Sequence, residues 1–422
     1  MENPKIRFKG FTKDWEQRKF SELVTIERGG SPRPIDKFIT NDENGLNWVK
    51  IGDAPEQGNY ITQTAEKIRP EGLSKTREVH PGDLILSNSM SFGRPYIMAI
   101  DGCIHDGWLA IRDTKKNFDL KFLCTLLGTD GMLNQYKAMA AGSTVNNLNK
   151  ELVGGTTVAF PMVEEQIKIG DYFTTLDHLI TLHQRKCEQT KKLKKYMLQK
   201  MFPRNGAKVP EIRFDGFTYD WEQRKLGELV KEGILEAPLD GNHGEKHPTS
   251  DEYVDSGIPF LMASDIHNGE VNIYSCKYIT KERAERLDKG FARNGDVLLT
   301  HKATIGETAI LSNLMTEYAM LTPQVTYYRI KNEERLNREY LYSFFNSLDF
   351  QTELKTKAAQ STRPYIGITA QQNLKIILPA EIDEQIRIGL YFRNLDHLIT
   401  LHQRKCDELK KMKKYMLQNM FI

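Results

Sequence analysis

The stretch LDHLITLHQRKC, Leu176–Cys187, occurs a second time at Leu395–Cys406, and the separation is 395 − 176 = 219 residues. The match extends over residues 165–202 and 384–421, in which 29 of 38 aligned positions are identical. Other segments of the chain have diverged further. We therefore predict that these two segments, named here the first arm and the second arm, are two copies of one structural part.

Both arms have the sequence pattern of a long helix with a single seam. Their apolar positions recur in alternating steps of four and three residues, which is the heptad period of a coiled coil. A helix of 38 residues is about 57 Å long, which suits a coiled coil better than an ordinary globular helix. The predicted seam positions are Tyr172, Leu176, Leu179, His183, Lys186, Thr190, Leu193 and Met197 in the first arm, and Tyr391, Leu395, Leu398, His402, Lys405, Leu409, Met412 and Met416 in the second.

Two interpretations of the seam histidines His183 and His402 remain open. They form a buried polar pair that penalises a slipped alignment, or they lie at the seam edge in water. A metal site that includes Cys187 and Cys406 is a weaker alternative, because the usual ligand spacings are missing.

Length and composition limit the possible classes of protein. A chain of 422 residues can form two to four domains. It has no run of 18 apolar residues for a membrane span, and its first residues lack the apolar core of a secretion signal. Five cysteines without a C-x-x-C pair suit a reduced, cytoplasmic protein without a zinc ribbon.

Positive charge is concentrated in the arms. Each arm has eight Lys or Arg and four Asp or Glu, so each carries 8 − 4 = +4, while the chain carries +3 in total. The rest of the chain therefore carries 3 − 8 = −5. The lysines of KKLKKY (191–196) and KKMKKY (410–415) could follow a phosphate backbone, or they could form a solvated helix face.

A second duplication opens each half of the chain. Residues 4–24 and 210–230 share an aromatic cluster and the sequence WEQRK, so Trp15 matches Trp221 and Arg18 matches Arg224. We expect these segments to pack against the base of an arm and to contribute to partner docking, because two identical partners need two equivalent surfaces. No nucleophile is paired with an acid or base there, so catalysis is not expected.

The segments between these repeats, residues 25–160 and 231–378, are two diverged bodies with an α+β pattern. Gly- and Pro-rich loops separate the predicted elements. The predicted strands are NWVKIGD (47–53), DLILS (83–87), DVLLT (296–300), QVTYYRI (324–330) and LKIILP (374–379), and the predicted helices include DLKFLCTLLGT (119–129) and REYLYSFFNSL (338–348).

The repeats predict a tandem layout with pseudo-twofold symmetry, in which two mixed α/β bodies are separated by two long antiparallel coiled-coil helices. Such a rod could hold two reading domains at a fixed separation on DNA, whose groove positions recur every 34–36 Å. The expected domains are a first body (1–164), the first arm (165–202), a linker (203–210), a second body (211–383) and the second arm (384–422).

Motifs for several enzymatic activities are missing from the sequence. There is no Gly-Lys pair for a P-loop, no Pro-Pro pair of the amino-methyltransferase signature, no dinucleotide-binding glycine motif and no H-E-x-x-H. Asp349, Glu353 and Lys355 faintly resemble a nuclease motif, but they lie in a helix-like stretch. Neither body has a convincing catalytic constellation.

The arms, with Pro161, Glu165-Gln166 and LDHLITLHQRK, resemble the helical spacers of the DNA-specificity subunits of type I restriction–modification systems. The likeness extends over essentially the whole chain. In the first body GGSPRP, WVKIGD, SNSMSFGRPYI and CIHDGW look like one lineage of target-recognition domains, and in the second DGNHGEKHP, GIPFLMASDI, NGDVLLTHKATIG and ITAQQNLKIILP look like another.

This resemblance implies a non-catalytic, cytoplasmic subunit of a phage-defence system. It would read a split, asymmetric target on double-stranded DNA, with one half-site for each body. It would bind two methyltransferase subunits and, through them, two restriction–translocase subunits. S-adenosylmethionine, ATP and Mg²⁺ would then be held by those partners and not by this chain.

Candidate DNA-binding residues are loop side chains with hydrogen-bond donors suited to base edges or phosphates. Arg94 is the foremost candidate, because arginine that donates two hydrogen bonds to guanine is the commonest specific contact. Trp108, which lies in the same CIHDGW segment as His105, could belong to the core instead of the DNA-binding surface. The candidates are Ser31, Arg33, Asn88, Ser91, Arg94 and His105 in the first body, and His243, Lys246, His301, Lys302, Thr304, Arg363 and Tyr365 in the second.

Two rival functions remain. A coiled-coil adaptor that binds only proteins would show no salt-dependent affinity for DNA. A self-contained nuclease would cut DNA with metal alone. The target bases, the spacer length, the methylated adenines and the oligomeric state without partners do not follow from the sequence.

Overall fold

The computed structural model describes residues 3–56, 58–88, 92–140, 148–204, 206–359 and 364–422. The chain forms two compact units. The first unit contains Met1–Arg185 together with His402–Ile422, and the second contains Lys186–Leu401. Each unit therefore combines one body with the beginning of one arm and the end of the other.

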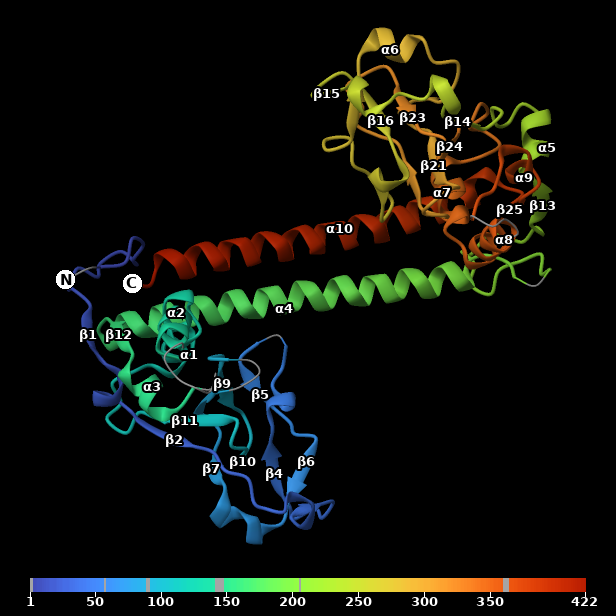
Figure 1. The fold of residues 1–422 in the computed structure, drawn as a ribbon. Coiled ribbons are helices and arrows are strands. Elements are labelled where there is room, and N and C mark those ends of the chain that lie inside the picture. The colour runs from blue at the N-terminus through green and yellow to red at the C-terminus, as the bar shows by residue number, and fades with distance from the viewer. Residues whose placement is uncertain (1–2, 57, 89–91, 141–147, 205, 360–363) are drawn as a thin grey trace. The chain divides into compact units, whose positions relative to one another are not determined.

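Each predicted arm is a single helix of 38 residues, α4 (Val163–Lys200) and α10 (Ile382–Asn419) (Figure 1). Acidic residues lie in the first turn of both helices, where they favour the positive end of the helix dipole. The two helices run antiparallel in both units. In the first unit Asp177 contacts Lys413 and His183 contacts His402, whereas in the second Lys194 contacts Asp396.

The seam differs from the prediction in every second position. Leu176, His183, Leu395, His402 and their heptad equivalents Met197 and Met416 are buried or half-buried, as expected. The alternate positions lie one residue later than predicted, so Leu193, Leu398 and Met412 are exposed and Leu179 is only half-buried. Their places are taken by Phe173, Ile180, Cys187 and Lys194 in α4 and by Phe392, Ile399, Cys406 and Lys413 in α10.

Lysine occupies two of these seam positions because its ammonium group has an acidic partner on the opposite helix. Lys413 Nζ lies 2.5 Å from Asp177 Oδ1 in the first unit, and the equivalent Lys194 Nζ lies 2.5 Å from Asp396 Oδ1 in the second. His183 Nδ1 and His402 Nδ1 are 3.1 Å apart, which supports the interpretation of a polar pair within the seam. One ring nitrogen must donate and the other accept for this contact to form.

The first body consists of two five-stranded sheets with a shared core. Strands from both sheets contribute buried side chains to it, among them Val49, Ile85, Ile104 and Trp108. One sheet has the order β3-β6-β4-β10-β7, with β3 Ile39–Thr40, β4 Leu46–Val49, β6 Glu66–Ile68, β7 Arg77–Val79 and β10 Gly102–Ile104. The other has the order β2-β11-β8-β9-β5, with β2 Thr25–Arg28, β5 Tyr60–Ile61, β8 Leu84–Ser87, β9 Pro95–Met98 and β11 Trp108–Arg112.

The second body repeats this design, and its core includes Leu261, Leu298, Ala309 and Leu321 from two sheets. One sheet has the order β15-β19-β16-β23-β20, with β15 Tyr253–Val254, β16 Ile258–Leu261, β19 Lys277–Ile279, β20 Phe291–Ala292 and β23 Ala319–Leu321. The other has the order β14-β24-β21-β22, with β14 Leu239–Asp240, β21 Val297–Thr300, β22 Thr308–Ile310 and β24 Val325–Tyr328. A small hairpin pairs β17 (Ile266–His267) with β18 (Glu270–Val271).

Short helices join each body to the arms, and in the first unit α1 and α2 lie beside α4 (Figure 1). Residues of the two EQRK segments pair with the strand that precedes each arm, in the antiparallel pairs β1 (Glu16–Lys19) with β12 (Thr157–Phe160) and β13 (Glu222–Lys225) with β25 (Lys375–Leu378). The helices are α1 Leu120–Leu127, α2 Asp130–Ala140, α3 Lys150–Gly155, α5 Leu226–Lys231, α7 Arg338–Phe345, α8 Leu348–Ala358 and α9 Ile368–Gln372. A further helix, α6 (Lys281–Glu285), lies within the second body, where Ala284 packs with Phe260 and Ile279.

An aromatic cluster holds each body to both arms. In the first unit the Phe421 ring, just beyond α10, stacks on Phe122 at 5.7 Å and lies 5.8 Å from Phe173 and 6.2 Å from Trp15. In the second unit the equivalent Phe202, just beyond α4, contacts Phe392, Tyr340 and Trp221 at 5.8–6.3 Å. Trp15 and Trp221 are therefore core residues. The expectation that these two side chains dock a partner is wrong, since they are 0% and 4% exposed.

The Glu-Gln pair at the start of each arm explains why the opening segments are duplicated. Glu165 is 1% exposed and accepts two hydrogen bonds from Arg7, at 2.9 and 2.7 Å. Glu384 does the same for Arg213. Gln166 accepts from the backbone N–H of Asp119 and donates to two carbonyls, and so anchors the segment that leads into α1. Each opening segment is thus fixed to an arm by charge as well as by packing.

The predicted strands and helices of the bodies are present, with one partial exception. Strand β4 ends at Val49, and residues 51–53 form a 3₁₀ turn where the prediction continued the strand. Asp349, Glu353 and Lys355 lie in α8, as their helix-like context indicated. The fold class, two α+β bodies with a pair of antiparallel arm helices, agrees with the prediction.

We predict that Phe421→Ala destabilises the first unit by about 3–5 kcal/mol, because it leaves a cavity among Trp15, Phe122 and Phe173. Urea denaturation followed by tryptophan fluorescence measures the effect. Tyr415→Ala, at a half-exposed position of α10, is the matched control and should change stability by less than about 1 kcal/mol. Equal losses in both variants would contradict the assigned role of Phe421.

Candidate nucleic-acid interface

The β8–β9 hairpin of the first body and the β21–β22 hairpin of the second are closed by the same hydrogen bond. In the first body Gly93 N–H donates to Ser87 O, and in the second Gly306 N–H donates to Thr300 O, both at 2.9 Å. Both glycines have positive φ values, +74° and +96°, which a side chain would strain. The two segments have the same length but different sequences, SNSMSFG (87–93) and THKATIG (300–306).

The first residue of each loop is buried and does not reach out to solvent. Asn88 and His301 directly follow β8 and β21 and are 2% and 0% exposed. Each uses its carbonyl to accept a backbone N–H, from Leu148 in the first body and from Ile366 in the second. The expectation that these two side chains contact DNA directly is wrong, because both point into the body at the end of a central strand.

Four predicted residues of the first body come together around Asp106, in the turn before β11, three at its carboxylate and one at its main-chain oxygen. Ser31 Oγ donates to Asp106 Oδ1 at 3.0 Å, and Arg33 Nη2 lies 3.8 Å from Oδ2. Asn88 Nδ2 donates to the main-chain oxygen of Asp106 at 2.9 Å. The Arg33 side chain is 82% exposed and is available to a ligand.

His105 is oriented by its neighbours on both ring nitrogens. Gly107 N–H donates to His105 Nδ1 at 2.9 Å, so the proton of the neutral ring is on Nε2. Nε2 lies 2.9 Å from Asp106 Oδ1. Neither ring nitrogen is left for a base in this arrangement, and His105 serves to hold Asp106.

A second carboxylate, that of Asp240 at the end of β14, lies among the candidate residues of the second body. It is 2% exposed and accepts hydrogen bonds from His243 Nε2 at 2.9 Å and from Lys289 Nζ. Burial raises the pKa of Asp240, but the hydrogen bonds from Lys289 and His243 lower it further than burial raises it, so the net shift is downward. The carboxylate therefore stays charged and holds two cationic or polar side chains in place.

His301 lies beside this carboxylate in an unusual electrostatic position. Its Nδ1 donates to Ile366 O at 3.0 Å, which leaves Nε2 as an acceptor 3.9 Å from Asp240 Oδ2. Among the described residues Nε2 has no hydrogen-bond partner. Burial lowers the pKa of His301 to about 4, so the ring is neutral near pH 7.

The remaining candidates of the second body surround this buried pair. The Tyr365 ring lies 5.5 Å from the His301 ring, and Lys302 forms a β-bridge with Tyr365. Lys302 and Thr304 are exposed on the hairpin loop, on either side of Ala303, whose φ is +67°. Lys246 lies in the 3₁₀ turn that follows His243 and is paired with Asp288.

Arg94, the foremost candidate from sequence, is occupied within the first body. Its guanidinium donates to the carbonyl oxygens of Glu56 and Gly58 at 2.9 and 3.3 Å and lies over the Tyr96 ring at 5.0 Å. This geometry ties the β8–β9 hairpin to the segment before β5, and contact with a base stays a prediction. Ser91 and Arg363 lie outside the described residues.

Sequence reasoning missed the two carboxylates at the centre of these clusters. A search for groups that bind DNA favours hydrogen-bond donors, so acidic residues are passed over. The available signal was local composition, since Asp106 follows His105 in CIHDGW and Asp240 precedes His243 in DGNHG. Among the described residues no group of three or more His, Cys, Asp or Glu could hold a metal ion.

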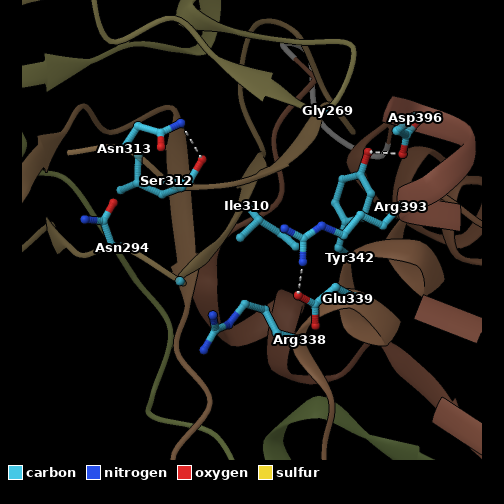
Figure 2. Close-up of a pocket in the computed structure, with 12 residues that line it drawn as sticks. Gly269, Asn294, Ile310, Ser312, Asn313, Arg338, Glu339, Tyr342, Arg393 and Asp396 are labelled. Carbon is cyan, nitrogen blue, oxygen red and sulfur yellow. Dashed lines mark hydrogen bonds and ion pairs between the residues drawn. The ribbon is translucent and has the colours of Figure 1, made fainter. Parts of the chain in front are cut away.

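The second unit also contains a cavity of about 400 Å³, but none of the predicted DNA-binding residues lines it. Figure 2 shows Tyr342 of α7 directed at Asp396 and Arg393 of α10 directed at Glu339. Tyr342 Oη donates to Asp396 Oδ2 at 3.0 Å, and Arg393 Nη1 donates to Glu339 Oε1 at 3.1 Å. These hydrogen bonds connect α7 to α10, so the cavity lies at the junction of the second body and its arm.

Comparison with known proteins identifies the family. The sequence profile of the type I restriction modification DNA specificity domain matches residues 12–192 and 219–411, one copy in each half. The chain belongs to the DNA-specificity subunits of type I restriction–modification systems. Both halves of this specificity chain are thus target-recognition domains with their arms, as the resemblance implied.

Relatives match over nearly the whole specificity chain. The type I restriction enzyme MjaVIII specificity subunit of Methanocaldococcus jannaschii is 24% identical over 421 residues, covering 96% of this chain and 91% of the relative. The EcoBI specificity subunit of Escherichia coli is 23% identical over 393 residues, covering 89% and 77%. The solved S subunit from M. genitalium shares the fold, with a TM-score of 0.65 at 14% identity and coverage of 100% and 99%. No helix in the described part of the chain is long and apolar enough to cross a membrane.

We predict that buried His301 makes the stability of the protein depend on pH. Below pH 6.5 the unfolded chain binds a proton at this histidine that the folded protein, with a pKa of about 4, does not bind. Stability should therefore fall by about 2 kcal/mol between pH 7.5 and pH 5 through this group alone. His301→Asn, which copies the Asn88 of the first body, should remove that part of the pH dependence in urea denaturation. Identical slopes for the wild-type and variant chains would contradict the prediction.

Proposed function

We propose that this specificity chain reads a bipartite, asymmetric sequence on double-stranded DNA, with one half-site for each body. The observation that supports this most is that hairpins closed by the same hydrogen bond carry different loop sequences. Arg94 in the first body stands where Glu307 stands in the second, and the sequence SMS (89–91) corresponds to KAT (302–304). Two different sets of donors and acceptors favour different bases, so the target would not be palindromic.

We further propose that the arms set the distance between the half-sites. α4 and α10 have 38 residues each, and such a helix is about 57 Å long. The ion pairs Lys413–Asp177 and Lys194–Asp396 and the contact between His183 and His402 penalise a slipped alignment of the two helices. A fixed alignment would give a fixed number of unread base pairs between the half-sites.

The arms are also the proposed docking surface for two identical methyltransferase subunits. Several arm residues, among them the predicted seam positions Leu193, Leu398 and Met412, are apolar although they are exposed. In the second unit Leu193, Tyr196, Leu398 and Leu401 are 41–50% exposed. In the first unit their repeat equivalents Met412 and Tyr415 are 47% and 58% exposed, beside half-buried Leu179 and Leu182. Apolar residues exposed twice at equivalent positions fit two copies of one partner. Arg18 and Arg224, on the EQRK strands, remain further candidates for this docking.

The restriction–translocase subunits would bind through the methyltransferase subunits. A solved structure concerned with complex assembly of the type I system resembles this chain, with a TM-score of 0.51, 20% identity and coverage of 97% and 98%. The chain itself would not be catalytic, and the partners would hold S-adenosylmethionine, ATP and Mg²⁺. We also propose that its domains follow the boundaries expected from the sequence and that it works in the cytoplasm.

Mapping of methylated bases tests the reading function. A host that expresses this chain with its methyltransferase partner should carry methylated adenines within a two-part motif whose halves differ and are separated by a constant spacer. A protein-only adaptor would produce no new methylated motif and no salt-dependent affinity for DNA. Cleavage by the purified chain with metal alone would contradict the non-catalytic assignment.

A charge placed on the exposed apolar face of the arms should weaken partner binding without unfolding the chain. We predict that Leu193→Glu together with Leu398→Glu lowers affinity for the methyltransferase subunit at least tenfold, because both side chains are more than 40% exposed in the chain alone. Lys192→Glu, exposed on the same helix, is the control for added negative charge. Calorimetric titration measures binding, and thermal melting measures stability. Unchanged affinity, or a large loss of stability, would reject the assignment of this face.

A further inference from the structure

Each body has one carboxylate at the centre of its predicted DNA-binding residues. DNA phosphates repel a negative charge, so Asp106 and Asp240 should weaken binding to any duplex if they had no other effect. Side-chain charges that oppose phosphate binding need a separate physical reason. The contacts of the two carboxylates provide one.

Asp106 fixes three segments of the first body relative to one another. Its carboxylate accepts from Ser31 in the loop after β2 and lies beside His105 in its own turn. Its main-chain oxygen accepts from Arg28 Nε at 3.2 Å and from Asn88 Nδ2 at 2.9 Å. The close approach of the loop after β2 to this turn also restricts Gly29, because a Cβ there would lie 2.2 Å from His105 O.

Asp240 fixes an equivalent set of segments in the second body. It binds His243 in the loop after β14 and Lys289 in the segment before β20, and it faces buried His301 at the start of the β21–β22 hairpin. Gly241, the next residue, has no room for a Cβ, which would lie 1.8 Å from Leu321 O. Its N–H donates to Thr322 O in the turn before β24.

The two carboxylates bind side chains of equivalent loops but come from different segments of the chain. β14 is the edge strand beside β24, as β2 is beside β11, so the loop of His243 after β14 corresponds to the loop of Ser31 after β2. Asp240 lies on that edge strand, whereas Asp106 lies in the turn that precedes β11. Equivalent loops that are bound from different segments indicate that a carboxylate is needed there, and not only that it was copied by duplication.

We propose that Asp106 and Asp240 are positioning residues for sequence recognition, each of which fixes the hydrogen-bonding side chains of its own body in the orientation that base edges require. This inference rests on the proposed function, in which each body reads one half-site. Neither carboxylate contacts DNA. Each removes rotamer freedom from neighbouring side chains before binding, which favours the matching sequence and adds nothing to binding through phosphates.

The test compares Asp106→Asn and Asp240→Asn in the full-length chain by selection from a duplex library randomised over the whole target. Asp240→Asn should flatten base preference in the half-site of the second body alone, and Asp106→Asn in the other half-site alone. The ratio of matching to random-sequence affinity should fall at least tenfold in each variant. Affinity for random duplex at fixed salt should stay equal or rise, because a negative charge has been removed.

Asp255→Asn is the matched control, since Asp255 is an exposed aspartate of the same body. This variant removes the same charge and should leave the base preference in both half-sites unchanged. Thermal melting shows whether each variant is folded. If Asp240→Asn is unfolded, His243→Gln and Lys289→Gln remove the partners of the same carboxylate from half-exposed and partly exposed sites, and they should flatten the same half-site.

The outcomes separate this inference from the proposed function. A wild-type preference without two parts would overturn the proposed function and the positioning role together. A two-part wild-type preference that persists unchanged in the folded carboxylate variants would overturn the positioning role alone. Uniform weakening on all sequences, or flattening of both half-sites by a single variant, would also overturn it.

Discussion

The structure depends on one packing arrangement, the insertion of a phenylalanine from the end of one arm between the body and the beginning of the other arm. Phe421 packs among Trp15, Phe122 and Phe173 in the first unit, and Phe202 occupies the equivalent site in the second. Together with the ion pairs Arg7–Glu165 and Arg213–Glu384, each ring fixes the orientation of its body on the helices beside it. The orientation of the predicted reading loops therefore depends on a contact far from them in the sequence.

The arms and the class of the bodies could be predicted from the sequence, because repeated identity and heptad spacing are local signals. The alternate seam positions could not. Leu193 and Met412 are more hydrophobic than Lys194 and Lys413, so a pattern of apolar residues favours the wrong neighbour. Only the antiparallel partner helix, which places Asp396 and Asp177 opposite the lysines, makes burial of their aliphatic stems favourable.

The candidate site was predicted in part for a similar reason. Segment positions were sound, since Ser31, Arg33 and His105 do meet in the first body and His243 and Tyr365 lie about the same buried pair in the second. The directions of the side chains could not be predicted. Asn88 and His301 lie in polar, loop-like sequence, and only the position of the preceding strand shows that both side chains are buried. The central carboxylates depend on contacts between segments up to 75 residues apart, as between Ser31 and Asp106, and no local pattern reports such a contact.

The place of Phe421 has a consequence for how the first unit forms during translation. Trp15 and Phe421 are separated by 421 − 15 = 406 residues, so at typical ribosome speeds the ring that completes the core emerges about 20–80 s after the tryptophan. For that time the first body presents an unfilled aromatic site to the cell. The second unit has no such wait, since Phe202 emerges before Trp221 and the rest of its body. A chaperone that recognises exposed aromatic surface would therefore meet the nascent first half far longer than the second.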